Sequence, residues 1–244
     1  MSTETHLNGE KPALLFLHGM FSRENDWKSS VEHFSKNWTV LAPNLPICDL
    51  PNSETCVNGL TQFVSRFLDE HGVKRAIACG NSLGGHVALL LALKNPERFP
   101  ALVLAGSSGL FERSFERGVP VRPDRAWLRN KIGEVFFDSK HATEDLIEEV
   151  REMIFDSRRV RKIVRMAKSA KQNNLRDRLH QIACPVSLIW GEDDSVTPPS
   201  VAHEFNDRLP NAELHFIQRC GHAPTIEQPE RFNTLLENTL AKHF

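Results

Sequence analysis

The chain has 244 residues, 40% of them hydrophobic, which suits one domain with a sizeable core. Its formal net charge of −1 gives it no overall attraction to nucleic acid or to an anionic membrane surface. The first residues lack the basic and apolar regions of a secretory signal, and no apolar run is long enough to cross a bilayer.

Short apolar runs of strand length recur along the chain, and they are continuous rather than alternating, as is typical of strands buried on both faces. The runs cover residues 13–17, 39–42, 76–79, 102–105, 186–190 and 213–217. Helical patterns stand between or after them at residues 61–71, 82–95, 199–208 and 229–243. This alternation predicts an α/β protein with a doubly wound, mostly parallel sheet and right-handed crossovers.

The segment between the fourth and fifth predicted strands has helical patterns, for example at residues 146–155, but no good strand candidate. We interpret residues 112–181 as a helical cap inserted into a core made of residues 1–111 and 182–244. Residues 112–180 carry 17 Lys and Arg against 12 Asp and Glu. These charges indicate either solvated helix faces or a basic lid that attracts an anionic substrate.

A serine among glycines follows the third predicted strand, in the segment CGNSLGGH. Gly80, Ser82 and Gly84 form a G-x-S-x-G pattern, in which a sharp strand-to-helix turn leaves no room for side chains two positions before and after the serine. Such a turn exposes the hydroxyl at the carboxyl end of the strand. It also places the Leu83 N–H at a helix N-terminus, where it can donate to an oxyanion. We therefore predict that Ser82 is a nucleophile.

A serine hydroxyl needs a base to take its proton, and the base needs a carboxylate that orients it. His222, in CGHAPTIEQPERF, lies in a glycine-bearing loop between the last predicted strand and the last helix. Asp193 and Asp194, in WGEDDSVTPP, both follow the fifth predicted strand. The order serine, aspartate, histidine is the one expected when a nucleophile elbow is followed by acid and base.

A second oxyanion donor is expected in the loop after the first strand, in LLFLHGMF. The backbone N–H of Met20 is the better candidate because it directly follows the glycine turn, and Phe21 is expected to border the substrate. We interpret His18 as structural, because it lies where the loop leaves the strand. His86, one helical turn after Ser82, is expected to pack under the turn.

The segments HGMF, GNSLGG, WGEDDSVTP and CGHAP, in this order and each after a predicted strand, resemble the α/β-hydrolase superfamily over nearly the whole chain. The resemblance implies an esterase-like enzyme with a serine nucleophile and a helical cap. It also implies that the acid is the third residue after the glycine ending its strand, which from Gly191 is Asp194. The chain is similar to compact pimeloyl-ester esterases. It is similar as well to meta-cleavage product hydrolases, which cut carbon–carbon bonds, although those typically carry tryptophan where this chain has Ala223-Pro224-Thr225.

Together these patterns predict a serine hydrolase that cleaves a small carboxylic ester through Ser82, His222 and Asp194. One alternative is a carbon–carbon bond hydrolase or lyase for a carboxylate-bearing substrate, and another is a receptor-like ligand-binding protein with little turnover. The chemistry needs neither metal nor organic cofactor, and the five scattered cysteines lack metal-ligand spacing. We expect a cytoplasmic protein with a small-molecule substrate, anionic if the basic lid acts on it, and with no nucleic-acid or membrane partner.

Overall fold

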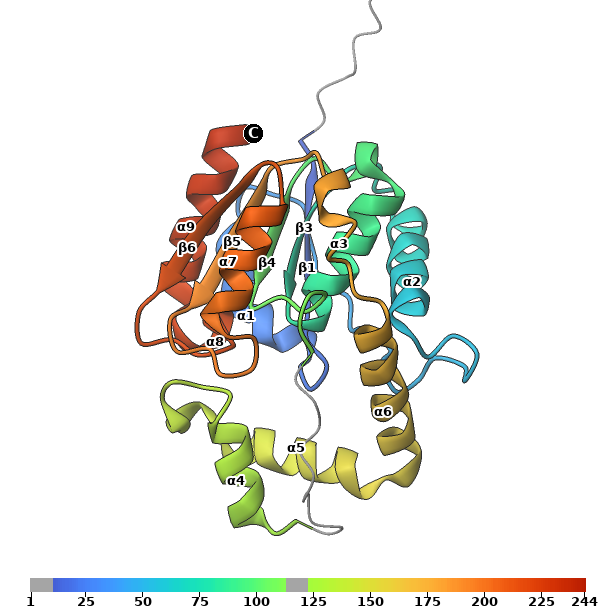
Figure 1. Cartoon of the computed structure of the whole chain (residues 1–244), viewed down its shortest axis with the longest axis vertical. Coiled ribbons are helices and arrows are strands. Elements are labelled where there is room, and N and C mark those ends of the chain that lie inside the picture. Colours follow the sequence, from blue (N-terminus) through green and yellow to red (C-terminus); the bar gives the residue numbers. More distant parts are fainter. Residues whose placement is uncertain (1–10, 113–122) are drawn as a thin grey trace, which may run out of the picture.

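The computed structural model describes residues 11–112 and 123–244, and within them a six-stranded sheet has the order β2-β1-β3-β4-β5-β6 (Figure 1). The strands are β1 (Ala13–Leu17), β2 (Val40–Leu41), β3 (Ala76–Asn81), β4 (Leu102–Ala105), β5 (Val186–Gly191) and β6 (Ala212–Ile217). Neighbouring strands of this sheet pair in parallel, with Leu15 opposite Ala78 and Leu104 opposite Leu188. The predicted doubly wound parallel sheet is confirmed. Its order reverses at β1, which pairs with both β2 and β3, and open α/β sheets bind ligands at the carboxyl side of such a switch point.

Helices cover both faces of the sheet (Figure 1). On one face lie α2 (Val57–Glu70), α3 (Leu83–Lys94) and α7 (Pro199–Arg208), and on the other α1 (Lys28–Phe34), α8 (Pro224–Glu227) and α9 (Pro229–His243). Helix α3 is apolar around most of its circumference and almost wholly buried, as expected for a helix at the centre of the core. Within the described ranges, no helix combines the length and the apolarity needed to span a bilayer.

Local capping explains where α2 begins, four residues before its predicted start. Cys56 is the N-cap, and its Sγ accepts the Gly59 N–H at 3.3 Å. A cysteine is not among the usual N-cap residues, so the sequence carried no start signal at this position.

Three helices, α4 (Arg125–Gly133), α5 (Glu144–Phe155) and α6 (Ser157–Gln172), follow β4 in the chain and precede β5. Figure 1 shows them together beyond one end of the sheet, with α6 leading back beside α2. Each begins at a residue whose side chain accepts backbone N–H groups, namely Asp124, Thr143 and Asp156. Short 3₁₀ turns lie at η1 (Glu24–Trp27), η2 (Pro96–Arg98), η3 (Ser139–His141) and η4 (Leu179–Gln181).

Candidate active site

Ser82 occupies a strained turn between β3 and α3. Its φ of 52° and ψ of −118° lie in a region that non-glycine residues rarely adopt. A Cβ added at Gly80 would lie 2.4 Å from the Gly84 carbonyl, and one added at Gly84 would lie 2.1 Å from Leu17 O. These distances explain the two glycines that flank Ser82, because any side chain there would collide with main chain.

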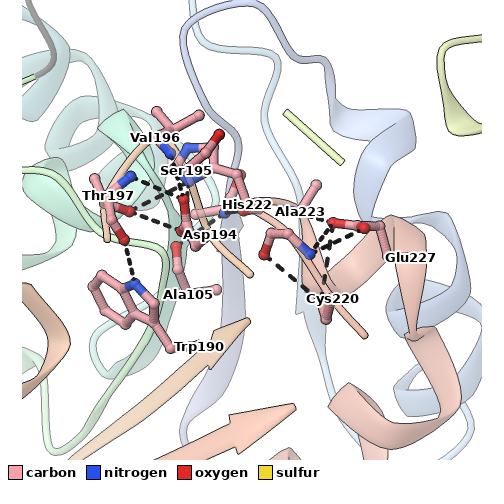
Figure 2. Close-up of polar contacts among 12 residues, drawn as sticks. Ala105, Trp190, Asp194, Ser195, Val196, Thr197, Cys220, His222, Ala223 and Glu227 are labelled. Atoms are coloured by element: carbon pink, nitrogen blue, oxygen red, sulfur yellow. Dashed lines mark hydrogen bonds and ion pairs between the residues drawn. The ribbon is translucent and has the colours of Figure 1, made fainter. Parts of the chain in front are cut away.

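Two buried side chains from neighbouring loops form a hydrogen-bonded acid–base pair. His222 Nδ1 lies 2.9 Å from Asp194 Oδ2, and Asp194 is 2% exposed (Figure 2). Thr197 Oγ1 donates to Asp194 Oδ2 at 2.9 Å, while the Val196 and Thr197 N–H groups donate to Oδ1. Because the carboxylate accepts the proton on Nδ1, His222 Nε2 is left as the basic nitrogen.

The structure places Asp194, and not Asp193, against His222. Asp193 is exposed, and its backbone N–H donates to Cys220 O at 2.9 Å. Asp194 lies three positions after Gly191, the last residue of β5. Its carboxylate is held by the loop that follows it in the chain, where the Thr197 N–H donates to Oδ1. Thr197, which sequence reasoning missed, completes the hydrogen bonds of that carboxylate.

The serine turn and the histidine loop are joined through the end of β4. Ala105 O accepts the Ser82 N–H at 3.0 Å and the Asn81 side-chain amide at 2.9 Å. The same Asn81 amide donates to His222 O at 3.0 Å. Asn81, which directly precedes Ser82, is therefore hydrogen-bonded to the main chain of His222. This role could not be predicted from the sequence.

Gly106 lies directly against the acid–base pair. Its φ is +49°, and an added Cβ would stand 2.9 Å from His222 Nδ1 and 3.0 Å from Asp194 Oδ2. The position therefore needs glycine twice, for its backbone conformation and for the space beside the hydrogen bond.

We expect Gly106→Ala to lower kcat at least about tenfold and the free energy of unfolding by about 1 to 3 kcal/mol, because the methyl group must displace His222 or Asp194. Gly72→Ala is the matched control, since Gly72 also has a positive φ, +66°, but no atom within 4 Å of an added Cβ. The control should lose only about 1 kcal/mol and keep its activity. Urea unfolding and ester hydrolysis of both variants measure the difference, and equal activity losses would refute the steric explanation.

The loop after β1 approaches Ser82 from the other side. A Cβ at Gly19 would lie 3.3 Å from Ser82 Cβ, so the loop that carries Met20 adjoins the turn of Ser82. Leu83 is the first residue of α3, where an N–H has no preceding turn to accept it. Phe21 lies in the same loop as Met20 with its side chain 39% exposed. The structure thus places the loop of Met20 and Phe21 next to Ser82 through Gly19, and the roles of Met20, Leu83 and Phe21 stay predictions.

His18 secures the start of this loop. The Leu45 N–H donates to His18 Nε2 at 2.8 Å, so the ring proton lies on Nδ1, which is 2.8 Å from Gly19 O. Burial lowers the pKa of His18. These contacts agree with the structural interpretation of His18.

A second buried histidine lies one helical turn after Ser82. His86 is fully buried, its backbone N–H donates to Ser82 O, and its Nε2 lies 3.4 Å from Asn173 Oδ1 at the end of α6. Its Nδ1 faces Glu112 Oε1 at 3.8 Å. Burial lowers the pKa of His86 to about 4 and raises the pKa of Glu112, and the latter carboxyl also interacts electrostatically with His222.

The basic side chains of the three helices α4 to α6 mostly contact acceptors of the protein itself. Five of them pair with carboxylates of the same region: Arg125 with Glu148, Arg129 with Glu144, Lys131 with Glu134, Arg151 with Glu148 and Arg159 with Asp156. Lys162 and Arg165 donate to the main-chain carbonyls of Leu50 and Asn52. In the parts of the chain that the structure describes, no three His, Cys, Asp or Glu side chains are grouped as metal ligands.

The sequence matches the Alpha/beta hydrolase family over residues 14–235, and the chain belongs to this family. It is therefore an enzyme of the hydrolase class, in agreement with the resemblance drawn from its motifs.

Three similar proteins illustrate the range within the family. A 2-hydroxy-6-oxononadienedioate/2-hydroxy-6-oxononatrienedioate hydrolase of Paraburkholderia xenovorans is 31% identical over 80% of this chain and 71% of the relative. A pimeloyl-[acyl-carrier protein] methyl ester esterase of Nitrosomonas europaea is 29% identical over 95% of this chain and 96% of the relative. The crystal structure of an alpha/beta hydrolase from the sediment metagenome of the Mar Chica lagoon in Morocco superimposes with a TM-score of 0.78. It is 33% identical and covers 96% of this chain and 92% of that one.

Proposed function

We propose that this hydrolase cleaves a small carboxylic ester through an acyl-enzyme on Ser82. The observation that carries the proposal is the buried Asp194–His222 pair, 2.9 Å apart, on loops that are hydrogen-bonded through Asn81 and Ala105 to the strained turn of Ser82. An imidazole that is oriented by a carboxylate and linked by hydrogen bonds to a partly exposed serine turn suits acyl transfer.

In the proposed reaction, His222 Nε2 takes the Ser82 hydroxyl proton while Oγ forms a bond to the acyl carbon. Backbone N–H groups of Met20 and Leu83 donate to the oxyanion, and Asp194 stabilises the imidazolium. The carbon–oxygen bond to the alcohol then breaks, and His222 returns the proton to the leaving alcohol. A water molecule, deprotonated by His222, releases the acid and restores Ser82.

The charges around the site support an uncharged acyl group. The arginines of α4 and α5 pair with carboxylates of the same helices, so they attract an anion weakly. The esterase from Nitrosomonas europaea, whose name describes ester cleavage, adds independent support.

A second candidate is hydrolysis of a carbon–carbon bond in a carboxylate-bearing dienoate. The specific observation in its favour is the 31% identity with the dienedioate hydrolase of Paraburkholderia xenovorans. On this candidate, basic side chains of α4 to α6 would attract the anionic substrate.

One experiment tests both candidates: reaction with a fluorophosphonate probe, followed by turnover of p-nitrophenyl acetate, butyrate and octanoate and of a 2-hydroxy-6-oxo dienedioate. We expect one adduct on Ser82 and faster turnover of an ester than of the dienedioate, because the arginines of α4 and α5 are already paired with carboxylates. Ser82→Ala should give no adduct, whereas Ser200→Ala, at an exposed serine of α7, should react like the parent. No labelling of the parent would refute the serine mechanism, and faster dienedioate turnover would establish the second candidate.

A further inference from the structure

Glu227, the last residue of α8, directs its carboxylate back to the loop that contains His222 (Figure 2). Both carboxylate oxygens lie 3.0 Å from the Gly221 N, and Oε1 is also 3.2 Å from the Ala223 N. The N–H groups on either side of His222 therefore donate to one carboxylate, which is half-buried and follows the histidine by five positions.

The same carboxylate also reaches the helical insertion. Phe137, which follows α4, donates its backbone N–H to Glu227 Oε2 at 2.7 Å. Hydrogen bonds to an ionised carboxylate are stronger than those between neutral groups. Glu227 thus connects two segments that are ninety residues apart in the chain.

Main-chain contacts between these two segments explain why the connection is so close. The His222 N–H donates to Val135 O at 2.9 Å. A Cβ added at Gly221 would lie 2.6 Å from Val135 O and 2.8 Å from Phe137 N. The three consecutive N–H groups of residues 221–223 are accordingly all bound, two by Glu227 and one by the segment after α4.

A third contact joins the same segment to the loop of the acid. Ser195 Oγ, next to Asp194 in the chain, donates to Glu134 O at 2.7 Å. Residues 134–137, which we call the cap loop, therefore contact the loops of both His222 and Asp194. The cap loop is part of the support of the acid–base pair and not only a cover above it.

We propose that Glu227 is a positioning residue that fixes the main chain of His222 and fastens the cap loop to it. This inference rests on the proposed role of His222 as the base. Proton transfer from Ser82 needs the imidazole in a narrow range of positions, and a displacement of about 1 Å lowers rates by about 10²-fold. A carboxylate suits the position because it only accepts hydrogen bonds, and three N–H groups surround it.

Glu227→Gln replaces one acceptor oxygen by an NH₂ group that faces N–H donors. We expect kcat on p-nitrophenyl butyrate to fall by about 10- to 100-fold, with a similar fall in the rate of fluorophosphonate labelling of Ser82. Glu230→Gln is the matched control, because Glu230 is exposed at the start of α9 and the substitution removes the same charge. It should react like the parent.

A double-mutant cycle with His222→Ala distinguishes positioning from a general structural effect. If Glu227 acts through His222, Glu227→Gln should change the residual rate of the His222→Ala variant by less than about twofold. The same fall in both backgrounds would overturn the proposal, and so would parent-like activity of folded Glu227→Gln. Should Glu227→Gln fail to fold, Glu227→Asp, which keeps the charge with a shorter reach, takes its place in the cycle. If His222→Ala itself retains full activity, the proposed function fails, whereas a large loss there with no effect at Glu227 refutes this inference alone.

Discussion

Replacing Asp194 by asparagine should lower kcat by about 10⁴-fold while leaving the fold intact. The Asp194 carboxylate accepts two backbone N–H groups through Oδ1, and an asparagine would keep its carbonyl oxygen there. Its NH₂ group would then face His222 Nδ1, in place of the oxygen now 2.9 Å away. The imidazole would have to accept at Nδ1 and carry its proton on Nε2, so that it could not take a proton from Ser82.

The neighbouring aspartate provides the control for this prediction. Asp193→Asn removes the same charge one residue away, but Asp193 is exposed and contacts Cys220 only through its backbone N–H. Its kcat should stay within about twofold of the parent, because exposed charges near a site contribute little. Ester hydrolysis of both variants measures kcat, and their thermal unfolding shows whether the fold is intact. A larger loss at Asp193 than at Asp194 would reassign the acid.

The stability of the protein should fall steeply in mild acid because of His86. Burial lowers the pKa of His86 from its ordinary value of 6.5 to about 4, so the unfolded chain binds a proton more readily than the folded protein between these values. Stability is therefore lost as the pH falls below 6.5, by about 2 to 3 kcal/mol between pH 7.5 and pH 4.5. The raised pKa of Glu112, which faces His86 Nδ1 at 3.8 Å, acts in the opposite direction.

Comparison with His86→Gln isolates the contribution of the histidine. Glutamine cannot be protonated but can still donate to Asn173, and Glu112 is present in both proteins. The stability advantage of the parent over the variant, from urea unfolding, should shrink by about 2 to 3 kcal/mol on going from pH 7.5 to pH 4.5. His180→Gln, at an exposed histidine of η4, should show no such change. An advantage independent of pH would contradict the assignment.

The sheet was predictable from the sequence because strands buried on both faces are continuous apolar runs. Strands β1 and β4 have the predicted bounds, and β3 and β5 are longer by two residues and by one. The helices α1 and α4 were missed, and both are short, with seven and nine residues. Helical periodicity is recognised over a window of about 11 to 18 residues, and helices this short do not fill one.

The candidate site also contains residues that were predicted from the sequence and residues that were missed. Ser82, Asp194 and His222 each follow a strand of a parallel sheet, and the carboxyl ends of such strands lie at one edge, so their proximity was predictable. Gly106 and Glu227 were missed, because their contacts depend on where separate loops meet. The position of Glu227, five residues after His222, was the available signal. The contacts of its carboxylate with the main chain could be recognised only in the fold.

The close approach of Gly84 to Leu17 O has a consequence for changing the substrate specificity of this protein by mutation. Main chain lies against main chain there, as it does where Gly221 meets Val135, and both contacts need only that the glycine is kept. A laboratory selection can therefore randomise the outward residues of α5 and α6 without altering the turn that presents Ser82. Libraries that spare residues 134–137 and these glycines would show whether the outward residues of α5 and α6 determine which molecules react.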